Sequence, residues 1–297
     1  MSNPASIEAL KQKACKENVL IFDMNNEYGE YEVSTMHVKD VPIFNVHPVK
    51  DIRRIVPFKR DDKGKTVKLK IGEMLKLLEE VVDTYKNGML LIEDPSKFMA
   101  KGISEDIIGS ICTNRHSSVD IIMHYQSISR PLPIIHENTN IYRFHHQADD
   151  VYRSEKKLLE STEAFKICQI IVDRSYHAFP DPKNPCKRKF VYYIKDLNII
   201  AGDFTKQEFI AAIDDYLDLN DKLVRKFEKK RDKESGELVY KDYKSAYQAY
   251  SSQLIRQYYG PDILAKTPPI EREAVFIIAS GLKGVGKTRE SMRHIFE

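Results

Sequence analysis

The stretch GLKGVGKT at residues 281–288 decides the fold that this chain can adopt. It matches the pattern G-x-x-x-x-G-K-[ST], in which glycines let backbone N–H groups turn inward onto phosphate oxygens. An apolar run typical of a strand, AVFIIA at 274–279, precedes it, and residues 289–296 can begin a helix. A strand that leads through a glycine-rich loop into a helix N-terminus is the arrangement that phosphate binding requires. The stretch therefore predicts a nucleotide-binding loop rather than a chance turn.

The predicted nucleotide contacts lie in this loop and in the residue after it. Lys287 is expected to reach the β- and γ-phosphates of ATP, and the Thr288 hydroxyl is expected to bind Mg²⁺. The other predicted contacts are Gly281, Gly284, Val285, Gly286 and Arg289. ATP and Mg²⁺ are thus the expected ligands.

The composition is typical of a globular protein with enough apolar material for a core. Of the 297 residues, 42% are hydrophobic and 31% are charged, and the net charge is +3. This charge is too small to indicate nucleic-acid binding by itself, so any basic surface must be local. The chain has no C-x-x-C pair, and no apolar run is as long as a signal peptide core or a membrane helix. We therefore expect reduced thiols, no zinc site, a cytoplasmic location and no membrane partner; the cysteines are Cys15, Cys112, Cys168 and Cys186.

Strand and helix patterns alternate in the first part of the chain, which predicts an α/β fold with a mostly parallel sheet flanked by helices. The expected strands are 19–22, 41–46, 89–92, 119–123 and 141–144, and the expected helices are 5–17, 71–85 and 103–112. Residues 52–57 are ambiguous. Beyond about residue 165 the pattern changes. There we expect a strand at 166–172, an edge strand at 190–194, a helix at 205–217, and a charged helical segment at 221–259 that is broken near 235–236.

The position of the phosphate loop predicts an unusual chain order. Such a loop normally opens its domain, because the sheet is built from the strands that follow it. Here nine residues follow Thr288, so the remaining strands must come from earlier in the chain. We expect a core made of 1–165 and 270–297, a mixed and then helical basic appendage at 166–260, and a linker at 261–269. The termini should lie close together in a circularly permuted chain, whether natural or engineered; a truncated chain is the alternative.

In that circular order the chain resembles the HerA/FtsK superfamily of DNA-translocating P-loop ATPases, which includes viral genome-packaging ATPases. The resemblance lies in GLKGVGKT at 281–288, VLIFDMNNEYG at 19–29, MLLIED at 89–94 and NRHSSVDIIMHYQSISR at 114–130. It implies an ASCE/RecA-like P-loop fold and ATP hydrolysis that moves double-stranded DNA through a homo-oligomeric ring, a pentamer or hexamer. Viral genome packaging is the favoured setting, with a portal or procapsid as docking partner. The alternatives are a conjugative or chromosomal DNA translocase, a P-loop kinase of a small molecule, and an assembly protein that binds ATP without hydrolysing it.

Glu93 and Asp94 come directly after a predicted buried strand, where open α/β sheets bind ligands. By position, Glu93 is expected to hold the Mg²⁺ hydration shell and Asp94 to orient or deprotonate the attacking water. The family usually has Asp-Glu at this place, so the order of the two roles stays open. An acidic turn that caps a helix is the alternative, because Asp94-Pro95-Ser96 suits a turn.

Other polar residues are also expected at this edge of the sheet. Gln126 follows the predicted strand 119–123, and its amide is expected to sense the γ-phosphate or to bind the attacking water. Asp23 and Glu27 follow the strand 19–22 and are expected to support the magnesium shell or to couple hydrolysis to movement. Turn formation and helix capping are the alternative for this pair.

The resemblance also implies an arginine that reaches the active site of a neighbouring subunit. Arg115 matches the position of this arginine in the family and is the first candidate for the role. Arg143 is the second candidate, followed by Arg130 and Arg153. Basic stretches that are candidates for DNA contact are 222–233, with seven Lys or Arg against two acids, and the loop residues Lys183, Lys187, Arg188 and Lys189. Solvated surface is the alternative for both stretches. The tyrosines at 240, 243, 247 and 250 recur at three- and four-residue spacing and predict helix packing or a subunit contact.

Overall fold

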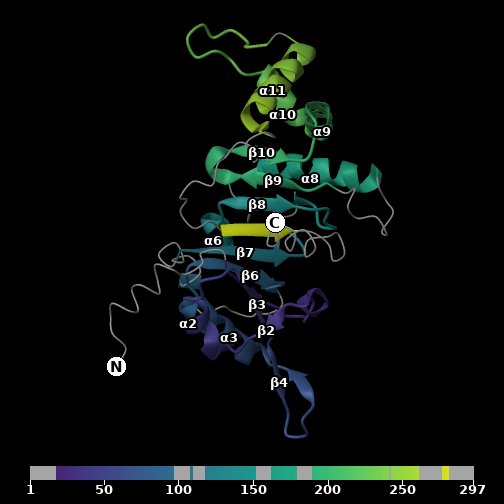
Figure 1. Ribbon diagram of the computed structural model, residues 1–297. Helices are drawn as coiled ribbons and strands as arrows, with labels where there is room; N and C mark the ends of the chain where they lie inside the picture. The colour runs from purple at the N-terminus through teal and green to yellow at the C-terminus, as the bar shows by residue number, and fades with distance from the viewer. Residues whose placement is uncertain are drawn as a thin grey trace.

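A nine-stranded sheet forms the centre of the molecule (Figure 1), with the strand order β10-β9-β8-β11-β7-β6-β1-β3-β2. The computed structural model describes residues 18–96, 108–109, 118–151, 162–178, 189–240, 242–260 and 276–280. Helices pack on the sheet, and most neighbouring strands are parallel. The predicted α/β class with a mostly parallel sheet is confirmed.

The strands of the large sheet are β1 (Val19–Phe22), β2 (Ser34–Thr35), β3 (Ile52–Ile55), β6 (Gly88–Glu93), β7 (Val119–Tyr125), β8 (Ile141–Phe144), β9 (Val191–Ile194), β10 (Ile199–Gly202) and β11 (Phe276–Ser280). β9 and β10 are antiparallel to their neighbours. β4 (Phe58–Arg60) and β5 (Thr66–Lys68) form a separate antiparallel hairpin. All four residues of β1 are buried, which explains the continuous apolar run of this strand.

The helices are α2 (Val41–Phe44), α3 (Ile71–Thr84), α6 (Pro133–Asn138), α8 (Thr162–Ala178), α9 (Lys206–Leu219), α10 (Asp221–Glu228) and α11 (Tyr243–Tyr258), with short 3-10 turns at Tyr28–Tyr31, Val38–Asp40 and Lys195–Leu197. α3 buries the apolar face that its sequence predicts, including Leu78 and Val81. α9 begins with a capping box: the Thr205 hydroxyl accepts a hydrogen bond from Glu208 N, and the Glu208 side chain accepts one from Thr205 N. None of the helices in these described parts combines the length and the apolar character that a membrane crossing requires.

β11 lies in the middle of the sheet although it follows every other strand along the chain. It pairs in parallel with β7 on one side and with β8 on the other, so that Ala279 is level with His124 and with Arg143. When the strands are taken in the order β11, β1, β6, β7, β8, they occupy the sheet as β8-β11-β7-β6-β1. The phosphate-loop residues 281–288 come directly after β11 and lie outside the described residues.

Two element predictions are wrong about the type of structure. Residues 41–46 were predicted as a strand but begin with the short helix α2, where Pro42 lies in the first turn and needs no N–H partner. Residues 166–172 were predicted as a strand but lie inside α8, which buries Phe165, Cys168 and Val172 at helical spacing. Short apolar runs do not distinguish a buried strand from a buried helix, and this ambiguity explains the second error.

The strand predicted at 190–194 is confirmed as β9, but its predicted position at the edge of the sheet is wrong. β9 pairs with β8 on one side and with β10 on the other, so β10 is the last strand of the sheet. The region predicted as an appendage, 166–260, therefore supplies β9 and β10 to the same sheet, and the predicted boundary at residue 165 falls inside α8. The predicted break in the segment 221–259 is confirmed, because α10 ends at Glu228 and α11 begins at Tyr243.

Tyrosine side chains join the helices of this second region to one carboxylate on α8. The hydroxyls of Tyr250 and Tyr258 donate to Glu163 at 2.8 Å each, and the Tyr216 hydroxyl donates at 3.3 Å. Tyr250 and Tyr258 come from α11, whereas Tyr216 comes from α9. The Tyr247 hydroxyl also bonds to Asp214 of α9, at 3.2 Å. The spaced tyrosines thus pack α11 against its neighbours, which confirms helix packing for this series.

Candidate functional site

The carboxyl ends of β1, β6, β7 and β11 meet at one edge of the sheet, because these strands are parallel neighbours (Figure 1). Asp23 follows β1, Asp94 follows β6 and Gln126 follows β7. Ser280, the last residue of β11, is level with Tyr125, so the phosphate-loop motif and Gln126 leave adjacent strands at the same height. The predicted site residues within the described chain are therefore brought to one edge, as expected for open α/β sheets.

Asp94 and Gln126 form a direct hydrogen bond across this edge. Gln126 Nε2 donates to Asp94 Oδ2 at 3.2 Å, and Ser96 Oγ donates to Asp94 Oδ1 at 2.5 Å. Asp94 is 7% exposed and has a left-handed backbone with φ of 42°. Aspartate is among the few residues that tolerate this conformation, which turns the chain sharply as the strand ends. Burial raises the pKa of the Tyr125 hydroxyl above its ordinary value, and the negative charge of Asp94 raises it further.

Glu93 has a different environment, although it is the adjacent residue. Its Oε1 atom accepts a hydrogen bond from the Tyr28 hydroxyl at 2.6 Å and lies 2.7 Å from His124 Nδ1. Glu93 and His124 are level on β6 and β7, and both side chains are buried. An ionised Glu93 requires the proton of the neutral imidazole to be on Nδ1. Tyr28 and His124 therefore fix the orientation of the Glu93 carboxylate.

Asp23 is held by donors from its own subunit. Its Oδ1 accepts from Glu27 N at 2.9 Å, and its Oδ2 accepts from Tyr28 N at 3.1 Å and from Arg54 Nη1 at 2.9 Å. The residue is fully buried. Arg54 also donates through Nε to Val33 O. This geometry favours the alternative of turn formation for Asp23, whereas its role as a magnesium ligand and the catalytic role of Glu27 stay predictions.

The loops that follow β7 and β8 are tied together beside Gln126. Ile128 N donates to Gln147 Oε1 at 3.0 Å, and Ser129 Oγ donates to Asp149 Oδ2 at 3.3 Å. Gln147 Nε2 in turn donates to Asp149 O. These bonds hold the chain on the carboxyl side of Gln126, so the amide is presented from a braced loop rather than from a free one.

The arginine predictions divide into described and undescribed positions. Arg115 and Arg153 lie outside the described residues, as do Lys183, Lys187, Arg188, Arg289 and the whole phosphate loop. Arg143 is 4% exposed and its guanidinium carbon lies 4.2 Å from the centroid of the Phe190 ring, a contact made within its own subunit. Arg130 is exposed on the loop after β7. Of these two, only Arg130 is placed to reach a neighbouring molecule.

The sequence reasoning missed Tyr28 and His124 as partners of Glu93. His124 could have been noticed, because it is a polar residue that ends an apolar strand, and counting from the start of both strands places it level with Glu93. Tyr28 had no comparable signal, since its contact spans 65 positions of the sequence. Among the described residues no group of three or more His, Cys, Asp or Glu could hold a metal ion.

Comparisons with known proteins find structural likenesses alone. No family model matches the sequence, and no curated protein matches it. The chain is similar to the genome packaging NTPase B204 from Sulfolobus turreted icosahedral virus 2 in complex with AMP, with 15% identity over 67% of this chain and 87% of that chain and a TM-score of 0.41. The complex of B204 with ATP-gammaS gives 16% identity, 66% and 84% coverage and a TM-score of 0.40. B204, the DNA-packaging ATPase from Sulfolobus turreted icosahedral virus, has 14% identity over 66% of this chain and 85% of that chain, with a TM-score of 0.39.

Proposed function

We propose that this chain is a P-loop ATPase that hydrolyses ATP to move double-stranded DNA as a homo-oligomeric ring, with viral genome packaging as its setting. One observation carries the ATPase part of the proposal. β11, whose next residues are GLKGVGKT, lies beside β7, and the Gln126 that follows β7 bonds to the Asp94 that follows β6. A phosphate-loop motif and a carboxylate–amide pair thus follow adjacent strands at one edge, where open α/β sheets bind ligands.

The proposed chain order is circularly permuted. The arrangement β8-β11-β7-β6-β1 supports this, because the strand before the phosphate loop lies between strands that come much earlier in the chain. A rearranged chain tests it: residues 270–297 are placed ahead of residue 1 through a short Gly-Ser linker. The rearranged chain should fold and hydrolyse ATP at a similar rate, and a chain that cannot fold would contradict the permuted order.

The residues at the edge have separate tasks in the proposed reaction. Lys287 and Thr288 would hold the phosphates and Mg²⁺, which neutralises the charge that develops during phosphoryl transfer. Asp94 would accept the proton of the attacking water, and the Gln126 amide, which already contacts Asp94, would orient that water. Glu93, oriented by Tyr28 and His124, would hold a water of the magnesium shell. This assignment keeps the order of roles expected from the sequence.

The ring and its DNA substrate are supported by the resemblance to the HerA/FtsK superfamily at residues 19–29, 89–94, 114–130 and 281–288. Arg115 would reach the ATP of a neighbouring subunit, with Arg130 as the second candidate because it is exposed. A portal or procapsid would be the docking partner in a packaging motor. Conjugative or chromosomal DNA transfer would use the same residues and remains the alternative.

Steady-state ATPase activity across protein concentration, with and without double-stranded DNA, tests this function. We expect the rate per subunit to rise with concentration and with DNA, and Lys287→Ala and Arg115→Ala each to abolish it. A mixture of these two inactive variants should recover part of the activity, because some interfaces then combine an intact loop with an intact arginine. Arg256→Ala, an exposed change on α11, serves as the control. Activity that depends on neither concentration nor DNA would refute the ring motor and favour a small-molecule kinase.

A further inference from the structure

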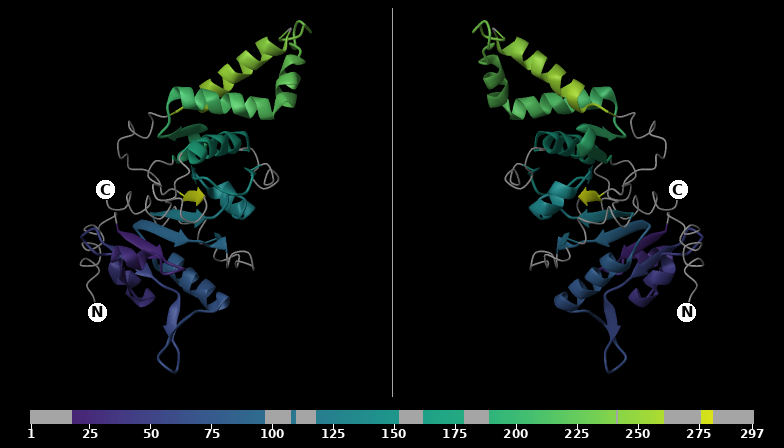
Figure 2. Two further views of the ribbon diagram at one scale, coloured as in Figure 1. Left: turned by 90° about the vertical axis from the view of Figure 1, so that its right-hand side faces the viewer. Right: turned by 90° about the vertical axis from the view of Figure 1, so that its left-hand side faces the viewer.

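The β4–β5 hairpin projects from the body of the molecule. It forms its own two-stranded sheet and pairs with none of the nine strands of the large sheet. Figure 1 shows it below β2 and β3, and both views of Figure 2 show it extending away from the rest of the chain. The hairpin follows β3 and precedes α3. It therefore leaves the sheet at the carboxyl end of β3, the same edge that carries Asp23, Asp94 and Gln126.

The hairpin concentrates positive charge. Residues 58–70 contain six basic residues, Lys59, Arg60, Lys63, Lys65, Lys68 and Lys70, against two acids, Asp61 and Asp62. Their net charge of +4 exceeds the +3 of the whole chain, so the remaining residues together are slightly negative. All six basic side chains belong to exposed residues. The low net charge of the chain means that any basic surface must be local, and this hairpin is such a surface.

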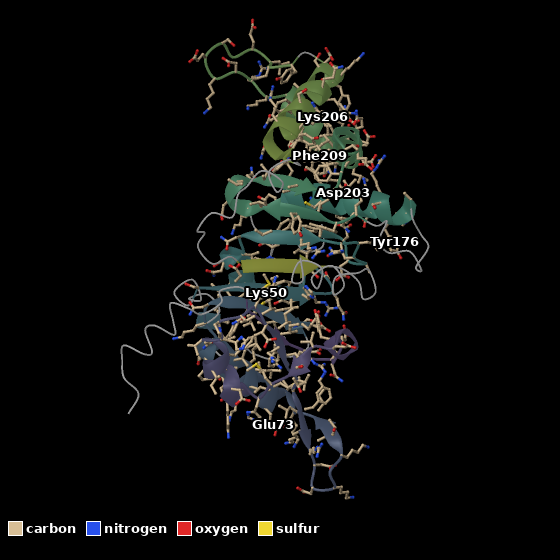
Figure 3. The ribbon with its side chains drawn as sticks, in the orientation of Figure 1. Lys50, Glu73, Tyr176, Asp203, Lys206 and Phe209 are labelled. Atoms are coloured by element: carbon tan, nitrogen blue, oxygen red, sulfur yellow. The ribbon has the colours of Figure 1, made fainter. Side chains whose placement is uncertain are left out.

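Part of this charge has a structural role at the base of the hairpin. Lys59 Nζ lies 2.6 Å from Glu73 Oε1 in the first turn of α3, and Glu73 also accepts from Lys70 N. Lys68 Nζ lies 5.9 Å from the centroid of the Phe58 ring. Figure 3 labels Glu73 beside this base. The two contacts with Glu73 connect the base of the hairpin to α3, and the Lys68–Phe58 contact joins the two strands of the hairpin.

The tip has a rigid turn and unopposed cations. Asp61 Oδ1 accepts from Lys63 N at 3.0 Å and from Lys65 N at 2.8 Å, and Gly64 has φ of 75°. The Asp61 carboxylate is thus used by the turn itself. Arg60, Lys63 and Lys65 form no ion pair with any described residue, and their charges face solvent.

The other basic stretch that the structure describes, 222–233, differs in this respect. Acidic residues surround it: residues 218–237 contain seven Lys or Arg and six Asp or Glu. Arg225 pairs with Asp221 at 2.7 Å and also lies 5.2 Å from the centroid of the Tyr243 ring. Arg231 Nη1 donates to Gly236 O. Much of this charge is balanced or used inside the helical region, so it attracts a polyanion less than the hairpin does.

We infer that the β4–β5 hairpin contacts double-stranded DNA, with Arg60, Lys63 and Lys65 on its phosphates. The inference rests on the proposed function, and it names the surface that holds the DNA. The DNA backbone is a dense polyanion, and binding through Lys and Arg releases counterions whatever the base sequence. A two-stranded ribbon also fits the width of the major groove, about 12 Å. The partner is DNA without sequence preference, which suits a motor that must pass any sequence.

The test compares two variants that each lose three positive charges. One carries Arg60→Gln, Lys63→Gln and Lys65→Gln; the control carries Lys222→Gln, Lys226→Gln and Lys229→Gln on and next to α10, where all three lysines are exposed. Fluorescence anisotropy with a labelled DNA duplex of mixed sequence gives the affinity at several salt concentrations. We expect the hairpin variant to bind at least tenfold more weakly and to lose about 0.9 from the salt slope per phosphate contact removed, whereas the control stays near wild type.

The outcomes separate the inference from the proposed function. Wild-type protein that binds DNA while the hairpin variant binds equally well would overturn the hairpin surface and leave the motor intact. Equal weakening in both variants would also overturn it, because total charge alone would then decide binding. Wild-type protein that binds no duplex at any salt concentration would overturn the DNA motor itself. Basal ATPase activity without DNA should be the same in both variants, which shows that they are folded.

Discussion

Asp23 and Asp94 occupy equivalent places in the sheet but differ in their surroundings. Both come directly after a buried parallel strand, and β1 and β6 are neighbours. Asp23 binds two backbone N–H groups and the Arg54 guanidinium, and it is fully buried. Asp94 accepts hydrogen bonds from the neutral side chains of Ser96 and Gln126.

The comparison shows that position at a strand end does not decide the role of a carboxylate. A carboxylate that already binds a cation and backbone donors stabilises a loop, and exchanging those partners for a ligand would leave a buried charge unpaired. A carboxylate bonded to neutral side chains can exchange one of them for water or a metal-bound water at lower cost. Mutations at these two positions and their partners test this distinction.

Asp94→Asn should have the largest effect on activity. The asparagine keeps an oxygen for Ser96 or Gln126 but cannot accept the proton of the attacking water. We expect kcat for ATP hydrolysis to fall about 10²–10⁴-fold, with little change in the urea midpoint of unfolding. Asp83→Asn, an exposed change on α3, is the control. Unchanged kcat in Asp94→Asn, together with a large loss in Glu93→Gln, would reverse the two roles.

Asp23→Ala should have the largest effect on stability. It leaves Arg54, whose side chain is 12% exposed, without its carboxylate and removes the acceptor of two backbone N–H groups. The free energy of unfolding should fall by about 3–5 kcal/mol, as for other partly buried ion pairs that lose one partner. Urea denaturation measures it, and Asp23→Asn should lose less. A stable Asp23→Ala protein that no longer binds Mg²⁺ with ATP would instead support the magnesium role.

Tyr28→Phe should have an intermediate effect, since Tyr28 bonds both to Asp23 and to Glu93, the neighbour of Asp94. Tyr28 donates its N–H to Asp23 and its hydroxyl to Glu93, and the substitution removes only the second bond. We expect the free energy of unfolding to fall by about 1–3 kcal/mol, because a buried acceptor loses a donor. A Tyr28→Phe protein with unchanged stability and unchanged kcat would show that the Tyr28 hydroxyl is not needed to orient Glu93.

Ser96→Ala should have the smallest effect. It removes a neutral donor to Asp94 in a partly exposed position, which we expect to cost about 0.5–1.5 kcal/mol in the free energy of unfolding. The KM for ATP and kcat should change less than in Asp94→Asn. A loss of activity as large as that of Asp94→Asn would mean that Ser96 itself takes part in the reaction.

Local patterns in the sequence were sufficient for the parallel strands β1, β6, β7 and β8, but not for β2 and β3. The runs predicted at 19–22, 89–92, 119–123 and 141–144 are all strands, and the first two have the continuous apolar character of a strand buried on both faces. β3 was ambiguous, since two of its four residues are arginines and one of them, Arg54, is required by Asp23. The two arginines made this strand hard to predict from the local pattern, and the contact with Asp23 explains why one of them is there.

Long-range contacts account for what the sequence could not show. The edge position of Asp94 and Gln126 follows from strand ends, so it could be predicted. The bond from Tyr28 to Glu93 joins distant parts of the chain. The contact of Arg143 with Phe190 depends on β9, which directly follows Phe190 and which the local pattern predicts as an edge strand. Periodicity reports which face of an element is apolar, but it does not report which element covers that face.

The central position of β11 has a consequence for synthesis of the protein. β7 and β8 leave the ribosome long before β11, because Phe276 follows Phe144 by nearly half of the chain. Until β11 is made, each of these strands has an edge of unpaired N–H and C=O groups, which can pair with another chain. The two halves of the sheet can therefore be joined only after β11 has been synthesised. A nascent chain with this strand order can complete its sheet only late in synthesis. The yield of folded protein should therefore depend on chaperones that cover the unpaired edges of β7 and β8.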